Sequence, residues 1–220
     1  MRISFLHTAQ AHVETFDSIF SQLDQSIELV HRVEPDLLSR ARSEGLDAVR
    51  DTVHAILASL SKSDAVVCTC STLGPLADEV SASLRHVIRV DRPMMEKACQ
   101  DGENIVVAIC LDSTRDATLA LLMGCAADLG KTISPRVVLC ETAWKHFEAG
   151  AMEDYARDIA NTVRADVLTR PDTDCIVLAQ ASMRVAESLL GSTGIPVRSS
   201  PMLAAERSIE VAIFRGAARS

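Results

Sequence analysis

The stretch of sequence that decides the fold spans residues 64–72 and reads Asp64-Ala65-Val66-Val67-Cys68-Thr69-Cys70-Ser71-Thr72. It begins as an apolar run without strict alternation, which is typical of a strand buried on both faces of a parallel sheet. It ends in small polar residues, and Leu73 and then Gly74-Pro75 follow, which favours the first turn of a helix. We therefore expect a buried strand that ends in a polar strand-to-helix turn.

Similar short apolar runs recur along the whole chain and alternate with longer segments of helical spacing. The predicted strands are Ile3–His7, Ile27–Val33, Ala65–Cys70, His86–Val90, Ile105–Cys110, Arg136–Cys140, Cys175–Ala179 and Pro196–Arg198. Apolar residues at i, i+3 and i+4 predict helices over Leu46–Leu60, Thr114–Leu129 and Met152–Val167. Strand–helix–strand alternation predicts an α/β protein with parallel sheets and right-handed crossovers.

The order of these elements indicates two related halves. A charged helix precedes the strand that starts at Asp64, and another precedes the strand that starts at Asp174. The second strand also ends in a small polar cluster, Gln180-Ala181-Ser182. Each cluster is expected to open a helix, and the two clusters are expected to face each other.

The boundary between the halves is expected near Arg92–Gly102. No linker rich in Pro, Gly or Ser lies there, so tightly packed halves are expected. We place the first half at residues 1–95 and the second at 96–201, with a C-terminal helix at 202–215 that can pack back on the first half.

The overall composition is that of an ordinary globular protein. The 220 residues are 48% hydrophobic and 24% charged, with a formal net charge of −8. This charge disfavours nucleic acid or an anionic membrane as a partner, because both require a basic surface. No apolar stretch approaches the ~20 residues of a membrane span, and the first apolar run is too short for a signal peptide. A cytoplasmic location is therefore expected.

The chain carries an odd number of cysteines, and most of them lie inside apolar runs. They are Cys68, Cys70, Cys99, Cys110, Cys125, Cys140 and Cys175. Disulfide frameworks belong mainly to small, loop-rich secreted proteins. Buried, reduced thiols are therefore the simpler interpretation.

Cys70 is the cysteine with the clearest chemical potential. Ligands of open α/β sheets bind at the carboxyl ends of strands, and a helix N-terminus there offers N–H groups to an anion. The same environment lowers the pKa of a thiol and makes it a better base or nucleophile. The open alternative is that Cys70 is one more core thiol. Cys68 is expected to lie one layer deeper and to be inert.

Several motifs, taken in order, are similar to those of the aspartate/glutamate racemase superfamily. Asp64–Thr72 resembles its first catalytic motif, in which a buried strand ends in Cys-Asn-Thr or Cys-Ser-Thr. Asp174–Met183 falls where the family carries its second motif, usually Gly-Cys-Thr-His. Weaker matches are Val90-Asp91-Arg92-Pro93-Met94, Asp112-Ser113-Thr114 and Ser199-Ser200-Pro201.

This resemblance implies a fold and a chemistry. The fold is α/β, with two pseudosymmetric parallel-sheet domains of the Asp/Glu racemase type and the active site between them. The chemistry is cofactor-independent proton transfer at the carbon next to a carboxylate, performed by one cysteine on each face of the substrate. The resemblance also suggests a homo-oligomer.

The sequence departs from the family pattern at two places. Gln180 stands where the second cysteine belongs, and Cys175 lies five residues too early to replace it. Glutamine has no titratable proton, so it can orient a carboxylate but cannot act as the second base. The N-terminal loop reads His7-Thr8-Ala9-Gln10 where amino-acid racemases usually carry Asp-Ser. Ordinary amino-acid racemisation is therefore not expected.

The candidate site combines residues from both halves. The catalytic candidates are Cys70, Gln180 and His7, and the candidates for substrate binding are Thr8, Gln10, Ser71, Thr72, Ser113, Thr114, Ala181 and Ser182. No His/Cys/Asp set has metal-ligand spacing, and no GxGxxG or P-loop sequence is present. No metal or cofactor is therefore expected.

Three functions remain open from the sequence. The first is a racemase or isomerase of a small carboxylate or related carbonyl compound, in which His7 or a water on Gln180 serves the face opposite Cys70. The second is a one-base lyase, such as a decarboxylase, and the third is a non-catalytic protein that binds small anions. The sequence does not name the substrate.

Overall fold

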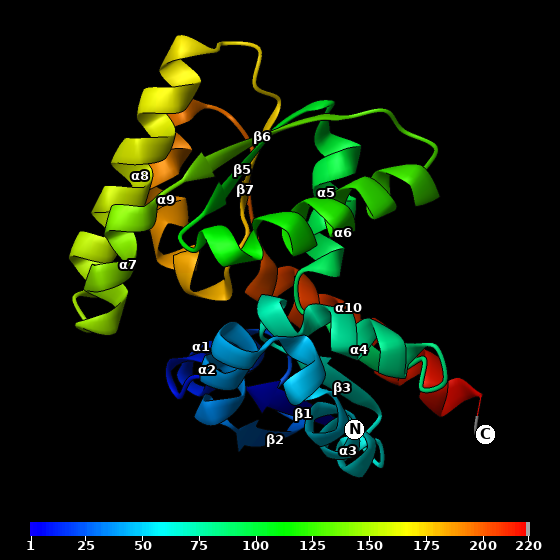
Figure 1. The fold of residues 1–220 in the computed structure, drawn as a ribbon. Coiled ribbons are helices and arrows are strands. Elements are labelled where there is room, and N and C mark those ends of the chain that lie inside the picture. Colours follow the sequence, from blue (N-terminus) through cyan, green and yellow to red (C-terminus); the bar gives the residue numbers. More distant parts are fainter. Residues whose placement is uncertain (219–220) are drawn as a thin grey trace. The chain divides into compact units, whose positions relative to one another are not determined.

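The computed structural model describes residues 1–218 and divides into two compact α/β units. One unit is Met1–Asp91 together with the segment from Pro201 onward, and the other is Arg92–Ser200. Figure 1 shows the elements of both. The boundary expected from the sequence, between residues 95 and 96, falls inside a helix of the second unit, α5 (Arg92–Asp101).

The first unit is built on a four-stranded parallel sheet with the order β2-β1-β3-β4. Its strands are β1 (Arg2–His7), β2 (Glu28–Val33), β3 (Ala65–Cys68) and β4 (Val87–Arg89). Its helices are α1 (Ala11–Leu23), α2 (Pro35–Glu44), α3 (Arg50–Leu60), α4 (Gly74–Ser81) and α10 (Ser200–Ala217), with 3₁₀ turns at Leu46–Ala48 and Ser71–Leu73.

Both faces of this sheet are buried, as the apolar runs predicted. Leu6, Val66 and Cys68 belong to the core that includes residues of α3 and α4. Phe5 and Val67 point to the opposite core, which includes residues of α1 and α10. The alternation follows from the two-residue period of a strand, so the C-terminal helix is part of the first unit's core.

The second unit repeats this plan, with the strand order β6-β5-β7-β8 and all strands parallel. Its strands are β5 (Asn104–Ile109), β6 (Ser134–Leu139), β7 (Cys175–Leu178) and β8 (Val197–Ser199). Besides α5, its helices are α6 (Arg115–Asp128), α7 (Glu141–Glu148), α8 (Met152–Thr169) and α9 (Glu187–Leu190), with 3₁₀ segments at Asp112–Thr114, Ala181–Ala186 and Gly191–Thr193. In Figure 1, α7, α8 and α9 lie on one face of this sheet and α5 and α6 on the other.

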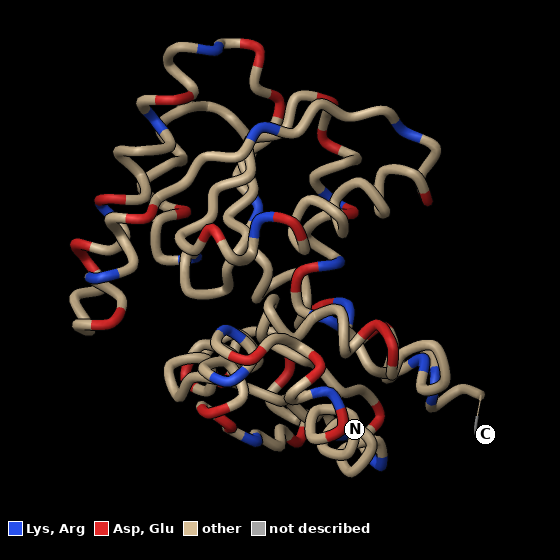
Figure 2. Tube along the Cα trace, viewed as in Figure 1, with Lys and Arg blue, Asp and Glu red and all other residues tan. Residues whose placement is uncertain are grey.

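The charged residues are distributed as this burial requires. Figure 2 shows Lys, Arg, Asp and Glu mainly on helices and loops. The central strands β3, β5 and β7 contain none of these four residue types. Within residues 1–218, no helix has the combination of length and apolar character that a membrane crossing requires.

The predicted α/β class, the parallel sheets and all eight predicted strands are confirmed, with small differences at the ends. One difference affects the site: the strand expected over Ala65–Cys70 ends at Cys68, so Cys70 lies in the turn that follows. A second difference is that both polar clusters open as 3₁₀ turns, Ser71–Leu73 and Ala181–Ala186. The 3₁₀ bonds arise because Leu73 N–H donates to the Cys70 carbonyl and Met183 N–H to the Gln180 carbonyl.

Candidate functional site

Cys70 sits at the strand-to-helix turn after β3, where the backbone is still extended, with φ −104° and ψ 114°. The preceding residue remains tied to β1, because Thr69 N–H donates to the Leu6 carbonyl at 3.0 Å. The 3₁₀ turn over Ser71–Leu73 then leads into α4. Cys70 is 7% exposed, so it lies at the edge of the core.

Hydrogen-bond donors near Cys70 lower the pKa of its thiol. They are the hydroxyls of Thr8 and Thr72 and the backbone N–H groups of Thr72 and Leu73, of which the Leu73 N–H donates to the Cys70 carbonyl. Burial is the larger effect and leaves the pKa of Cys70 above its usual value. The thiol is therefore protonated at neutral pH, in a setting that stabilises the thiolate once the proton leaves.

Cys68 differs from Cys70 in its exposure and in its place inside the strand. It is fully buried, and burial raises the pKa of its thiol to about 12. Its Sγ lies 3.9 Å from the Cys70 carbonyl oxygen, to which it donates. Cys68 is therefore a core thiol with no surface open to a reactant.

His7, at the end of β1, is fully buried and lies in a chain of hydrogen-bonded side chains. Its Nδ1 is 2.8 Å from Thr69 Oγ1, and its Nε2 is 2.8 Å from Nδ1 of His31. His31 Nε2 in turn lies 3.1 Å from Oδ1 of Asp17 on α1. The chain therefore runs from the residue before Cys70 to a half-exposed carboxylate.

Each ring nitrogen of His7 has one side-chain partner, which is the Thr69 hydroxyl for Nδ1 and the His31 ring for Nε2. The Thr69 hydroxyl also lies 3.1 Å from the Leu6 carbonyl. Burial, assisted by the neighbouring His31 and His12, lowers the pKa of His7 to about 3. His7 is therefore neutral, and both of its nitrogens are occupied by side chains.

A buried ionic cluster lies beneath the first turn of α4. Arg89, 5% exposed, donates from Nε and Nη2 to the two carboxylate oxygens of Asp91 at 2.7 and 2.9 Å, and from Nη1 to Asp78 at 2.6 Å. Gly74 packs against this guanidinium, since a Cβ placed there would be 2.4 Å from Nη2. The absence of a side chain at Gly74 lets the helix that follows Cys70 lie against β4.

In the second unit, Gln180 occupies the position that corresponds to Cys70. It follows β7 with an extended backbone, φ −111° and ψ 137°, and is 8% exposed. Its Oε1 accepts a 2.6 Å hydrogen bond from the backbone N–H of Cys110, the residue after β5. Gln180 therefore links the ends of two neighbouring strands. Its Nε2 has no partner within residues 1–218 and remains a donor for a ligand.

Tyr155 joins this cluster from α8. Its hydroxyl lies 2.9 Å from Ser182 Oγ and 3.5 Å from Cys110 Sγ. The side chain is fully buried, and burial raises the pKa of the phenol above its usual value. The sequence analysis missed Tyr155. The signal was available, because it is the one tyrosine of the chain and lies on the apolar side of the helical pattern at Met152–Val167.

The remaining predicted site residues differ in how they are placed. Thr114 is buried, and its hydroxyl donates to the Leu111 carbonyl at 2.8 Å, whereas Ser113 is exposed. Gln10 is exposed before α1 and makes no side-chain capping bond, and Ser71 and Ala181 are half-buried. Thr8 and Thr72 thus gather around Cys70, while Ser182 and Gln180 gather at β7.

The described chain shows one cluster of hydroxyls per unit and no obvious metal centre. Within residues 1–218, no three or more His, Cys, Asp or Glu side chains come together as a metal site would require. All seven cysteines are free thiols. That the clusters at Cys70 and Gln180 serve one ligand stays a prediction.

The sequence has no match among protein-family models, and no curated protein matches it. Known structures do match. A glutamate racemase from Bacillus anthracis aligns with a TM-score of 0.75 and 16% identity over 97% of this chain and 82% of that protein.

Two further structures align over nearly the whole chain. The aspartate racemase of Picrophilus torridus gives a TM-score of 0.70 and 14% identity over 96% of this chain and 94% of that one. An arylmalonate decarboxylase aligns with a TM-score of 0.61 and 13% identity over 96% of this chain and 92% of that one. Identities this low establish the fold alone, and the fold is the one that the ordered motifs predicted: that of the aspartate and glutamate racemases.

Proposed function

We propose that the chain is a cofactor-independent, racemase-like isomerase of a small carboxylate or related carbonyl compound, with Cys70 as the thiol that moves the proton. The observation that supports this most directly is the placement of Cys70 in the turn after β3, where the hydroxyls of Thr8 and Thr72 lower the pKa of its thiol. Cys68 lies inside β3 and has no such placement. The structural similarity to racemases supports the same reaction class.

In the proposed reaction Cys70 first releases its thiol proton to solvent, and the thiolate then accepts the proton from the carbon next to the carboxylate. The electron pair of the broken C–H bond delocalises onto the carboxylate oxygens, giving an enediolate and a neutral thiol. Return of a proton from a water on the opposite face of that carbon inverts the carbon and completes the turnover. Hydroxyls and N–H groups at the turn can donate hydrogen bonds to the enediolate and stabilise its extra negative charge.

The face of the substrate opposite Cys70 has no second thiol in this proposal. Gln180 holds a water or a carboxylate through its Nε2–H groups, while its Oε1 stays on the Cys110 N–H. His7 is a positioning residue, because both of its nitrogens are occupied and it acts on the turn through Thr69. With one titratable group in contact with substrate, aspartate and glutamate should not racemise at a useful rate.

A one-base lyase is the second candidate, and the raised pKa of Cys70 favours it. A thiol that is protonated at neutral pH is ready to donate to an enediolate left behind when CO₂ departs. Such a reaction needs no base on the opposite face, which agrees with glutamine at position 180. The arylmalonate decarboxylase of the same fold makes this reaction type a natural alternative.

Hydrogen exchange in D₂O separates these functions. The protein is incubated with small mono- and dicarboxylates, including both enantiomers of aspartate and glutamate, and followed by ¹H NMR and optical rotation. An isomerase replaces the hydrogen next to the carboxylate with deuterium, whereas a lyase releases CO₂. A ligand that raises the melting temperature without either change indicates binding only and contradicts both enzymatic proposals.

The contribution of each cluster is tested by variants at hydroxyls. Replacing Thr72 or Ser182 with Val removes one donor from the first or second unit. If both clusters serve one ligand, each variant weakens its binding. Unchanged affinity in both variants would contradict the assignment of the site.

A further inference from the structure

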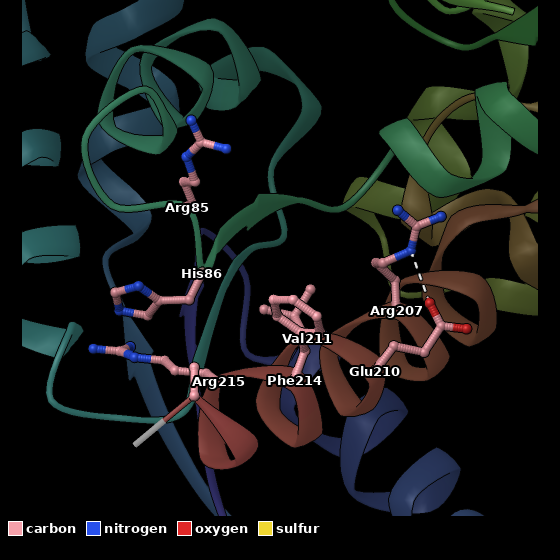
Figure 3. A pocket seen from close by; sticks show the side chains of 8 residues that line it. Arg85, His86, Arg207, Glu210, Val211, Phe214 and Arg215 are labelled. Carbon is pink, nitrogen blue, oxygen red and sulfur yellow. Dashed lines mark ion pairs between the residues drawn. The ribbon is translucent and has the colours of Figure 1, made fainter. Parts of the chain in front are cut away.

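The first unit contains a hollow of about 530 Å³, and neither Cys70 nor the residues around it line this hollow. Figure 3 shows the side chains that line it. They are Arg85, His86, Arg207, Glu210, Val211, Phe214, Arg215 and Ala218. The volume lies within the ~300–1,000 Å³ of small-molecule sites.

One side of the hollow is a single face of α10. Its residues recur at helical spacing, from Arg207 through Glu210 and Val211 to Phe214, and Ala218 follows directly after the helix. Phe214 is 80% exposed, an unusual setting for a phenylalanine, whose complete burial is worth about 1.5–3 kcal/mol. The ring therefore offers an apolar surface to whatever enters the hollow.

The other side comes from the segment before β4, with Arg85 and His86. Arg215 on α10 donates to the Ser63 carbonyl at 2.8 Å, and His86 Nε2 lies 3.0 Å from the Ser61 carbonyl. These hydrogen bonds fix the wall formed by Arg215 and His86.

Arginine is the commonest charged residue in the lining of the hollow. Three arginines and one glutamate line it, in a chain whose net charge is −8. Arg207 is paired with Glu210 at 3.1 Å. Arg85 is exposed, and within residues 1–218 no hydrogen bond or ion pair engages it. Figure 3 shows Arg85 and Arg207 on opposite sides of the hollow, with Val211 and Phe214 between them.

We propose that this hollow binds an organic anion with an aromatic body, namely an aryl carboxylate or aryl sulfonate. The aromatic body packs on Phe214 and Val211, and the anionic group pairs with Arg85. An anion without an apolar body would leave Phe214 in water, and an uncharged aromatic compound would leave Arg85 without a counter-charge. The combination of one exposed ring and surplus arginine charge therefore selects a molecule that carries both features.

The test uses 1-anilinonaphthalene-8-sulfonate as a fluorescent probe of the folded chain, displaced by 2-naphthoate or by its uncharged analogue 2-naphthalenemethanol. Saturable binding of the probe is expected, with displacement by 2-naphthoate at lower concentration than by the alcohol. Phe214→Ser should weaken binding by roughly tenfold, and Arg85→Gln by at least about threefold. Matched controls are Ile213→Ser, which removes an exposed side chain outside the lining, and Arg157→Gln, at an exposed arginine of the second unit.

Three results would overturn the proposal. One is equal probe affinity in Phe214→Ser and in the unmodified chain. Another is equal displacement by the acid and the alcohol. The third is a dimer, detected by sedimentation velocity, that dissociates on Phe214→Ser and excludes the probe as protein concentration rises. That result would assign the hollow to a second copy of the chain.

Discussion

A methyl group added at Gly74 would collide with the guanidinium of Arg89, at 2.4 Å from Nη2 and 2.6 Å from Cζ. An ordinary contact requires about 3.4 Å, so the guanidinium would have to move by about 1 Å. Such a shift would stretch its 2.7 and 2.9 Å hydrogen bonds to Asp91 beyond hydrogen-bonding range. Gly74→Ala therefore disturbs the ionic cluster beneath the helix that follows Cys70.

The size of this effect follows from the burial of Asp91, which is 1% exposed. Removing one partner of a buried ion pair costs about 3–5 kcal/mol of stability. The cost here is smaller, because a displaced Arg89 guanidinium keeps part of its electrostatic attraction to Asp91. The usual gain from replacing glycine by alanine in a helix, about 0.5–1 kcal/mol, acts in the opposite direction. The net loss of stability is expected to be about 2 kcal/mol, which lowers the melting temperature by about 4–8 °C.

Differential scanning calorimetry of Gly74→Ala measures this change, and Gly124→Ala is its matched control. Gly124 is exposed inside α6, and a Cβ there would meet nothing within 4 Å. The unfolding free energy of the control should therefore rise by about 0.5–1 kcal/mol, so that two glycine-to-alanine changes in helices alter the stability in opposite directions. A melting temperature of Gly74→Ala equal to or above that of the unmodified chain would refute this account of the cluster.

Three further predictions concern the residues around the candidate site. The pKa of His7 falls from 6.5 in the unfolded chain to about 3 in the folded chain. The contribution of neutral His7 to the free energy of unfolding is therefore complete above pH 6.5 and is lost as the pH falls from 6.5 towards 3. His7→Gln should flatten the pH dependence of urea unfolding by up to about 1.4 kcal/mol per pH unit, and an unchanged slope would contradict burial of a neutral His7. Thr72→Val removes the Thr72 hydroxyl, which lowers the pKa of Cys70, so alkylation of Cys70 by iodoacetamide, followed by peptide mass spectrometry, should slow at neutral pH; an equal or faster rate argues against this contact. Gln180→Leu leaves the Cys110 N–H without its acceptor and should cost about 1–3 kcal/mol of unfolding free energy in urea titrations, whereas no loss would show that the bond is dispensable.

The fold was predictable because its strands are buried on both faces. A run such as Ala65–Cys68 must be apolar at every position to fit between two cores, and that pattern is visible locally. The end of the strand was less predictable. Pairing with β4 stops at Cys68, opposite Arg89, so the extent of one strand depends on another strand about twenty residues away in sequence.

The positions of the candidate site residues relative to the strands could be predicted from the sequence, but the hydrogen bonds among them could not. Cys70 and Thr72 stand in one short segment, so their proximity to a strand end could be read from sequence. His7 could be placed at a strand end as well, but its hydrogen-bond partners lie 62 and 24 residues away, at Thr69 and His31. Tyr155 and Ser182 are 27 residues apart, and no local pattern connects them.

The proposed reaction depends on the thiol of Cys70 more than on any other group. The direct test is deuterium incorporation in D₂O at the carbon next to the carboxylate of the best substrate, compared between Cys70→Ser and Cys125→Ser. Cys125 is equally a buried free thiol but lies in α6, away from the strand ends. The account predicts that Cys125→Ser keeps the exchange rate and that Cys70→Ser loses it by about 10²–10⁴-fold. Full exchange by Cys70→Ser would contradict it.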